Sequence, residues 1–154
     1  MNINILSPEN FNCVTELIYK LQMDHLKKYG KYYALKDDVQ DRINRILGKL
    51  MRSRTTRIFV AIENQKCVGY ILLKIEKTIP IYLVEKYGYI SGLYVKEEFR
   101  NKDIATHLLK QAEKWFKQKN VPYAELKVAQ ENSAQEFWNK AGYAPKQTIR
   151  VKYF

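Results

Sequence analysis

Residues 57–75, RIFVAIENQKCVGYILLKI, constrain the fold of this chain more than any other stretch. Two runs rich in β-branched and aromatic residues flank a polar turn at Glu63, Asn64 and Gln65, which is the pattern of a β-hairpin. A short turn can join only adjacent antiparallel strands, because a parallel connection needs a crossover. The sequence therefore predicts an antiparallel pair of strands in the middle of the chain.

The residues after this hairpin alternate between strand and helix patterns. YISGLYV (89–95) predicts a strand that contains Gly92, and the apolar spacing from Ile104 predicts a helix that stops near Asn120. The further expected elements are a strand at AELKV (124–128), a short helix at SAQEFWNK (133–140) that ends at Gly142, and a last strand at TIRVKYF (148–154). Strand–helix–strand units require parallel pairing, so the sheet as a whole is predicted to be mixed.

The residues before the hairpin predict one more strand and two helices. NINIL (2–6) is a short strand candidate, and Ser7-Pro8-Glu9 is typical of a helix start. Apolar residues recur at helical spacing before Tyr29 and again over residues 39–50, while Pro80 predicts an irregular excursion over IPIYLVEKYG (79–88). We expect a mixed α/β fold with a central twisted sheet of about six to seven strands and helices on both faces.

The length and composition indicate one folded unit. The 154 residues are 46% hydrophobic, with no repeats, linkers or low-complexity segments, so we expect residues 1–154 to form a single domain. No signal peptide or membrane-spanning run is visible, which predicts a cytoplasmic protein without a membrane partner. Cys13 and Cys67 have no metal-ligand spacing and no disulfide-scaffold pattern, so both are expected to be half-buried thiols.

The formal net charge of +11 favours an anionic partner, such as a phosphorylated cofactor, a nucleic acid or a membrane surface. The lysines are scattered, whereas proteins that read nucleic acid phosphates concentrate arginine in one place. A solvated lysine-rich surface is therefore the favoured interpretation, and nucleic acid is not the favoured partner. The run RSRTTR (52–57) could contact a cofactor phosphate or nucleic acid, but a solvated helix end is the favoured interpretation.

The stretch FRNKDIATHLL (99–109) joins a predicted strand to a predicted helix through a short loop. Amide groups at a helix N-terminus point outward and the helix dipole is positive there, so such a loop binds an anion without a particular side chain. Arg100 and Lys102 add positive charge beside it. The loop is therefore a candidate phosphate site.

Two motifs resemble those of the GCN5-related N-acetyltransferase (GNAT) superfamily. In the first, Arg100, Ile104 and Ala105 match an Arg/Gln-x-x-Gly-x-Gly/Ala loop that follows an aliphatic strand end, here LYV. In the second, ENSAQEFWNKAGY matches a later signature at Ala134, Phe137, Trp138, Lys140, Gly142 and Tyr143. The order of predicted elements agrees as well, so the resemblance covers essentially the whole chain.

The resemblance implies an acyl-CoA N-acyltransferase-like fold, acetyl-CoA as acyl donor and direct acetyl transfer to a neutral primary amine. It implies that backbone groups of Leu93, Tyr94 and Val95 pair with the pantetheine arm, with the amide of Tyr94 stabilising the oxyanion. It also implies contacts from Asn132 and Trp138. The implied pyrophosphate-binding residues are Arg100, Asn101, Lys102, Asp103, Ile104, Ala105 and Thr106.

Several positions depart from the family pattern. Asp103 replaces the first loop glycine; its carboxylate repels a pyrophosphate, although aspartate tolerates left-handed backbone and caps helices well. The expected asparagine falls on Glu131, with Asn132 one place later. Trp138 stands where many relatives carry a tyrosine acid, and Tyr89 where some carry a glutamate base. No catalytic residue is therefore assigned; water or Tyr143 would protonate the thiolate, and a base would act through ordered water.

Tyrosines with nearby acidic residues mark the candidate acceptor site, because aromatic walls suit a cationic amine. The candidates are Tyr32, Tyr33, Tyr87 and Tyr89; the alternative is that they are half-buried tyrosines without a binding role. His25 and His107 are expected to be packing or surface residues. The alternative function is a non-catalytic module that binds acyl-CoA or nucleic acid, and a homodimer is possible in either case.

Overall fold

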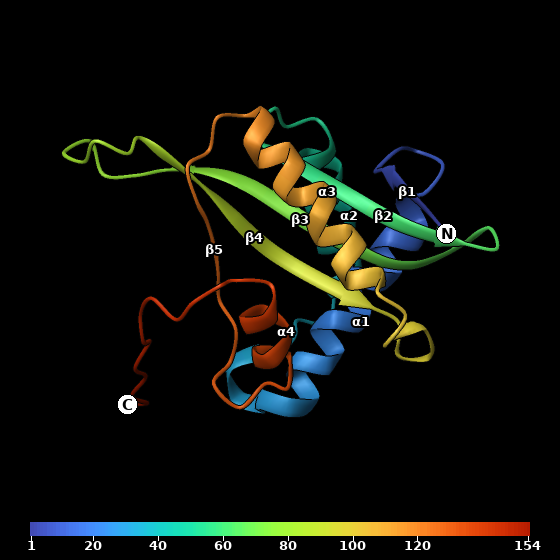
Figure 1. Cartoon of the computed structure of the whole chain (residues 1–154). Coiled ribbons are helices and arrows are strands. Elements are labelled where there is room, and N and C mark those ends of the chain that lie inside the picture. Colours follow the sequence, from blue (N-terminus) through green and yellow to red (C-terminus); the bar gives the residue numbers. More distant parts are fainter.

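A computed structural model describes residues 1–154 (Figure 1). Its strands are β1 (Asn2–Ile5), β2 (Thr56–Glu63), β3 (Lys66–Lys77), β4 (Lys86–Val95) and β5 (Ala124–Leu126). Its helices are α1 (Phe11–Tyr29), α2 (Val39–Met51), α3 (Ile104–Gln118) and α4 (Ala134–Lys140), with short 3₁₀ turns η1 (Gly30–Tyr33) and η2 (Glu97–Phe99). The order of elements agrees with the sequence prediction up to residue 140.

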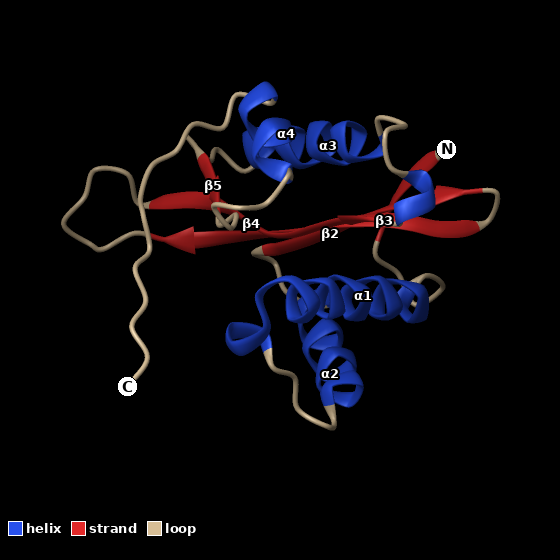
Figure 2. Cartoon of the chain, turned by 90° about the horizontal axis from the view of Figure 1, so that it is seen from below, coloured by secondary structure: helices blue, strands red, loops and turns tan.

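The strands form one mixed sheet in the order β1-β2-β3-β4-β5. The pairs from β1 to β4 are antiparallel, which confirms the central hairpin, and β5 pairs with β4 in parallel. The sheet has five strands, so the expectation of six to seven was too high. Helices cover both faces, with α3 and α4 on one side and α1 and α2 on the other (Figure 2).

The prediction of a strand at 148–154 is wrong, and this accounts for the missing strand. This segment alternates apolar and polar residues, yet it forms no strand and leaves Ile149, Val151 and Phe154 exposed. A strand needs a neighbouring edge for its backbone hydrogen bonds, and β5 offers only three residues. Side chains attach the tail instead: Lys146 Nζ lies 2.7 Å from Glu125 Oε2, and the Tyr153 ring lies 5.4 Å from the Tyr32 ring.

Each face of the sheet has its own apolar core. Under α3, Leu108, Ala112 and Phe116 pack on Ile71 and Ile90, because apolar residues at four-residue spacing share one helix face. Under α1 and α2, the core contains Val14, Leu17, Leu47, Val60 and Tyr70. Gly88 lets α3 approach β4, since a Cβ at this position would lie 2.7 Å from the Phe116 ring. These contacts hold α3 and α1 against opposite faces of the sheet.

Cys13 and Cys67 form a disulfide, so the expectation of two free thiols was wrong. Cys13 lies in the first turns of α1 and Cys67 near the start of β3. Packing of α1 on the sheet brings their Cα atoms to 6.1 Å, within the range that a disulfide spans. The two residues are 54 positions apart in the sequence, so their spacing did not reveal the pair.

Residues 78–85 connect β3 to β4 and project from one end of the sheet (Figure 1). This confirms the irregular excursion expected around Pro80. Ile81, Tyr82 and Leu83 are exposed on it. None of the helices combines the length and the apolar content that a membrane span requires.

Candidate functional site

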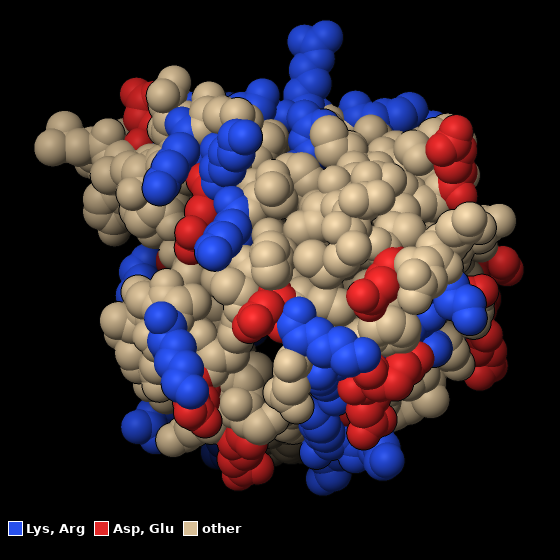
Figure 3. Space-filling model, turned by 45° about the vertical axis from the view of Figure 1, so that its right-hand side comes forward, with Lys and Arg blue, Asp and Glu red and all other residues tan.

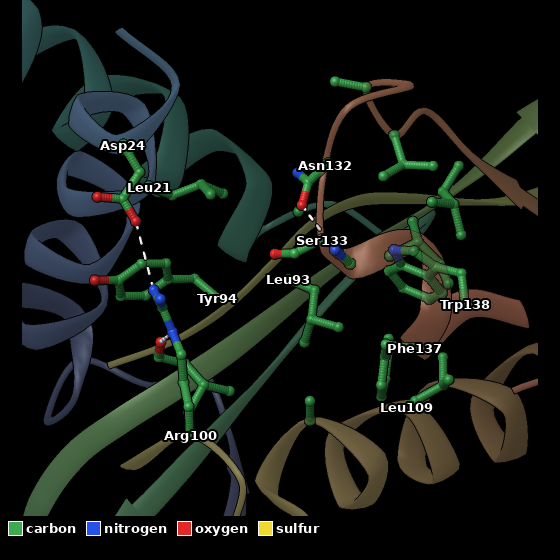
Figure 4. Close-up of a pocket in the computed structure, with 18 of the residues that line it drawn as sticks. Leu21, Asp24, Leu93, Tyr94, Arg100, Leu109, Asn132, Ser133, Phe137 and Trp138 are labelled. Carbon is green, nitrogen blue, oxygen red and sulfur yellow. Dashed lines mark hydrogen bonds and ion pairs between the residues drawn. The ribbon is translucent and has the colours of Figure 1, made fainter. Parts of the chain in front are cut away.

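A cleft of about 840 Å³ opens where β4 and β5 separate. Its walls come from both sides of the sheet: the last half of β4, the loop before α3 and the start of α3, the residues after β5, α4, and the C-terminal half of α1. Figure 4 shows Asp24, Tyr94 and Arg100 on one side of it and Asn132, Phe137 and Trp138 on the other, with Leu93 between them. The cleft thus connects the α3 face of the sheet with the α1 face.

The cleft exists because β4 extends further than its neighbour β5. The pairing of β4 with β5 ends at Ile90 opposite Leu126. Beyond this pair, residues 92–95 remain paired with β3 but have no strand on their other edge. The register shifts here as well, with Ile90 opposite Leu73 and Gly92 opposite Leu72, so Ser91 is a one-residue bulge.

The bulge decides which backbone groups face the cleft. After it, the amide of Lys96 donates to Val68 O on β3 at 2.8 Å, so the peptide groups of Tyr94, two residues earlier, also face β3. The Val95 carbonyl faces the other way, since it accepts the Nε–H of Arg100 at 3.0 Å. By the same alternation, both the N–H and the C=O of Leu93 face the cleft. The Tyr94 amide is therefore not placed to stabilise an oxyanion in the cleft, contrary to expectation, and the Leu93 amide is the one that faces the cleft.

The loop before α3 presents a row of free amides. None of the backbone N–H groups of residues 101–106 donates to a protein acceptor, and all six residues except Lys102 line the cleft. Asn101 and Asp103 have φ values of 60° and 57°. Left-handed residues in such a turn direct successive N–H groups to one side, which makes an anion-binding concavity. The position that the motif gives to glycine thus has the conformation for which glycine is favoured.

Asp103 adopts this left-handed conformation directly before α3 but does not cap the helix, since its carboxylate makes no capping hydrogen bond. The expected role as a side-chain cap is therefore wrong. Its backbone carbonyl accepts the N–H of His107 at 3.0 Å and lies 2.7 Å from His107 Nδ1. The carboxylate is left exposed beside the free amides.

The Arg100 side chain bonds to the protein on two sides. Its Nε–H reaches the Val95 carbonyl, its NH2 lies 3.5 Å from Asp24 Oδ2 on α1, and its guanidinium carbon lies 5.8 Å from the centre of the Tyr94 ring (Figure 4). Burial raises the pKa of Tyr94, and the Asp24 carboxylate raises it further. Arg100 therefore ties the loop, the end of β4 and α1 together.

The opposite wall comes from the residues before and within α4. Asn132 Oδ1 accepts the N–H of Ala134 at 2.9 Å, and Asn132 lines the cleft whereas Glu131 does not. Asn132, one residue after the position at which the motif has its asparagine, thus lies at the start of α4. Trp138 lines the cleft and is buried between Phe137 and Tyr143, whose ring centres lie 5.0 and 5.3 Å from its own.

Tyr143 does not line the cleft, so it is not placed to protonate a leaving group there. Its hydroxyl faces α3, where it lies 3.5 Å from Glu113 Oε1. Burial, together with the Glu113 carboxylate, raises the pKa of Tyr143 to about 12. The side chain that the sequence suggested as a proton donor is thus a packing residue behind Trp138.

The structure does not gather the acceptor-site tyrosines in the cleft. Only Tyr33 lines it. Tyr32 is 59% exposed and contacts Tyr153 of the tail. Tyr87 stacks on Tyr123, with 5.6 Å between ring centres, and Tyr89 is half-buried on β4 opposite Glu125 of β5. Burial raises the pKa of Tyr89, with nearby Tyr87, Glu125, Glu76 and Tyr33 adding to the shift.

His25 lines the cleft, although it was expected to be a packing or surface residue. A signal was present, because Leu21, Asp24, His25 and Lys28 recur at helical spacing and all line the cleft from α1. His107, in contrast, is exposed and lies outside the cleft lining, as expected.

Comparisons with known proteins agree with this architecture. A sequence model described as "Acetyltransferase (GNAT) family" matches residues 16–143. A search of curated proteins finds no match. Solved structures with the same fold include a tetramutant of the BH1408 protein from Bacillus halodurans, with 21% identity, coverage of 99% of this chain and 100% of the other, and a TM-score of 0.85.

Two further structures carry functional descriptions of their own. A predicted acetyltransferase with acetyl-CoA from Clostridium acetobutylicum shares 15% identity, over 98% of this chain and 95% of that one, with a TM-score of 0.81. The aminoglycoside antibiotic 6'-N-acetyltransferase AAC(6')-IG from Acinetobacter haemolyticus shares 21% identity, over 100% and 97%, with a TM-score of 0.74. At these identities the likeness shows the fold alone.

Proposed function

Because the chain belongs to the acetyltransferase (GNAT) family, we propose that it transfers an acetyl group from acetyl-CoA to a primary amine by direct attack. The solved relative with bound acetyl-CoA and the CoA complex of the aminoglycoside N-acetyltransferase AAC(6')-Iy support the donor. The aminoglycoside enzymes support an amine as acceptor class. The reaction forms the acetyl–nitrogen bond and breaks the acetyl–sulfur bond, which releases CoA.

One observation carries the proposal: an unpaired strand edge leads directly to a row of unpaired amides. A pantetheine arm contains amide groups, and the free C=O of Leu93 and the free N–H of Val95 are suited to pair with them. The free amides of residues 101–106 then offer a row of donors that suits a pyrophosphate. The cleft joins these two sets of groups.

The protein groups also suit acyl transfer itself. The Leu93 amide points into the cleft at the sheet opening, where it can donate to the oxygen that gains charge when an amine attacks a thioester. Arg100 fixes the neighbouring Val95 carbonyl and connects it to α1, which keeps this edge of β4 in place. The thioester carbonyl supplies the electrophile; the chain supplies position and a preorganised donor.

Calorimetry and thiol release test the proposal together. Acetyl-CoA should bind with a micromolar Kd while ATP does not bind, and a panel of primary amines should release CoA thiol. Binding without release from any amine would favour the non-catalytic acyl-CoA-binding alternative. The nucleic-acid alternative requires nucleic acid binding that weakens steeply with salt. On the face in Figure 3 the basic side chains are interspersed with acidic ones, so this face has no continuous basic stripe for a nucleic acid.

Asp103 is predicted to weaken cofactor binding through its charge. Asp103→Asn keeps a residue that tolerates the left-handed backbone and removes the repulsion, so we expect acetyl-CoA to bind about three- to tenfold tighter. Asp103→Gly should show the same gain in affinity and raise the free energy of unfolding by roughly 1 kcal/mol, because glycine adopts this conformation without strain. Calorimetry and denaturant melts measure the two effects separately.

Glu98→Gln is the matched control, since it removes the same charge from η2, outside the cleft lining. Its affinity for acetyl-CoA should stay within about twofold of wild type, because an exposed charge farther away is screened. If Asp103→Asn gains no more affinity for acetyl-CoA than this control does, charge repulsion in the loop is not what limits cofactor binding.

Tyr143→Phe is predicted to leave kcat unchanged within about twofold, because the hydroxyl faces Glu113 and lies outside the cleft lining. The free energy of unfolding should fall by at most about 1 kcal/mol, the value of one hydrogen bond. Steady-state thiol release and a thermal melt measure both. A fall in kcat of tenfold or more would show that Tyr143 reaches the reacting groups after all.

A further inference from the structure

We propose that the imidazole of His25 is the general base that takes the proton an acceptor ammonium must lose before it attacks. The proposal rests on the acetyl transfer proposed above and adds a catalytic residue to it. An amine is nucleophilic only when neutral, and primary alkyl amines are mainly protonated at neutral pH. The cleft therefore needs a group that accepts a proton near pH 7.

His25 lies one turn after the part of α1 that packs on the opened strand, and it lines the cleft. Leu21, one turn earlier on the same helix face, has its Cδ2 3.6 Å from where a Cβ on Gly92 would stand. Gly92 precedes Leu93, whose amide faces the cleft. His25 thus approaches the reacting region from the α1 side, while the loop amides hold the other end of the cleft on the α3 side.

Two tyrosines hold the imidazole without using its nitrogens. The His25 ring centre lies 4.9 Å from that of Tyr33 and 6.2 Å from that of Tyr29, in tilted arrangements. Neither ring nitrogen of His25 has a hydrogen-bond partner in the protein, whereas Nδ1 of His107 contacts the Asp103 carbonyl. The ring is therefore positioned by packing, and its nitrogens stay available to an amine in the cleft.

The carboxylates that line the cleft are less suited to act as the base. Asp24 pairs with Arg100, and Asp103 stands in the anion-binding loop. Glu136 pairs with Lys140 at 2.7 Å, and this hydrogen bond lowers the pKa of Glu136. Burial raises the pKa of Tyr94, which keeps its phenol protonated. His25 is the remaining cleft residue that is suited to accept a proton near neutral pH.

The surroundings of His25 keep the ring neutral. Partial burial lowers its pKa below the usual value of 6.5, Lys28 lowers it further, and Asp24 opposes both. The other titratable groups around the ring are Tyr29 and Tyr33 beside it and Tyr94 with Arg100 across the cleft. A neutral imidazole is ready to accept a proton at physiological pH, and this capacity is lost as the pH falls through the lowered pKa.

The proton balance closes without any further reactant. His25 takes one proton from the ammonium, and the neutral amine then attacks the thioester carbonyl. The tetrahedral intermediate collapses with cleavage of the carbon–sulfur bond, and the second proton of the attacking nitrogen ends on the CoA sulfur. The imidazolium of His25 returns its proton to water, which regenerates the free base.

The test compares His25→Gln with wild type in a thiol-release assay, with tyramine, sisomicin and a lysine peptide as acceptors. We expect kcat/KM to fall roughly 100-fold, at the low end of what a general base contributes. The limb of the pH profile between pH 5 and 7 should disappear in the variant, while the Kd for acetyl-CoA changes less than about twofold. Comparing the two profiles cancels the ionisation of the acceptor itself.

Two further variants make the result specific. His107→Gln removes the second of the two histidines and should retain the activity and pH profile of wild type. His25→Ala leaves a hole the size of the ring, and added imidazole should restore part of its activity, which no purely structural role predicts.

The outcomes separate the two proposals. A wild type that is active, with His25→Gln within threefold of it and the acidic limb retained, overturns the role of His25 and leaves acetyl transfer intact. Failure of imidazole to restore any activity to a folded His25→Ala counts against the base as well. A wild type that binds acetyl-CoA but releases no CoA with any of the amines overturns the proposed transfer, and the role of His25 with it.

Discussion

Leu93→Pro is expected to slow acetyl transfer about 100- to 1000-fold, the usual cost of removing one oxyanion donor. Proline removes the N–H that faces the cleft and no other hydrogen-bonding group. The bulge at Ser91 turns this N–H away from β3, so its loss costs the sheet no ladder bond. The affinity for acetyl-CoA should change much less than kcat, because the Leu93 carbonyl, the Val95 amide and the loop amides remain.

Tyr94→Pro is the matched control, because the Tyr94 amide faces Tyr70 on β3. This change leaves a buried carbonyl without its donor, which costs about 1–3 kcal/mol. Thermal melts should therefore show a clear loss of stability in Tyr94→Pro and a small one in Leu93→Pro. The reverse order would mean that the Tyr94 amide faces the cleft and the Leu93 amide faces β3. Leu93 would then not be the oxyanion donor.

Loss of the Cys13–Cys67 disulfide is expected to lower the free energy of unfolding by about 2–4 kcal/mol. The bond closes a loop across a sequence separation of 54, and a cross-link stabilises chiefly by restricting the unfolded chain. For a chain of this size the melting temperature should fall by roughly 5–15 °C. Thermal melts of the Cys13→Ser/Cys67→Ala double variant measure this.

A reducing agent supplies the control for the disulfide. It should destabilise the wild type to about the level of the double variant, and it should leave the double variant itself unchanged. Activity at 25 °C should stay near wild type, since neither cysteine lines the cleft. An unchanged melting temperature in reductant would show that the native cysteines are not joined. Structural disulfides are rare in the reducing cytosol, so this result also bears on the expected cytoplasmic location.

Much of the fold could be predicted because local patterns and their order determine it. The two runs around Asn64 form the hairpin, and the spacing of Leu108, Ala112 and Phe116 defines the packed face of α3. The tail shows the limit of such patterns. TIRVKYF has the alternation of a strand, but a strand forms only where a free edge accepts its hydrogen bonds.

Some features of the candidate site could likewise be predicted from the sequence, and others could not. The loop of free amides before α3 could be predicted from the sequence, because a strand, a short turn and a helix start place free amides together whatever the side chains are. It also indicated the left-handed backbone at Asp103, through the match to a motif glycine. The edge groups of β4 that face the cleft could not be predicted in this way, since the bulge at Ser91 arises from pairing with β3.

The tertiary structure also decided the roles of residues from distant segments. His25 belongs to the site, and Cys13 meets Cys67, because α1 packs against the sheet; Tyr143 leaves the site because its hydroxyl turns toward Glu113. Helix and loop patterns depend on interactions within a few residues and can be read along the chain. The approach of one element to another depends on the packing of both cores, which no single stretch of sequence contains.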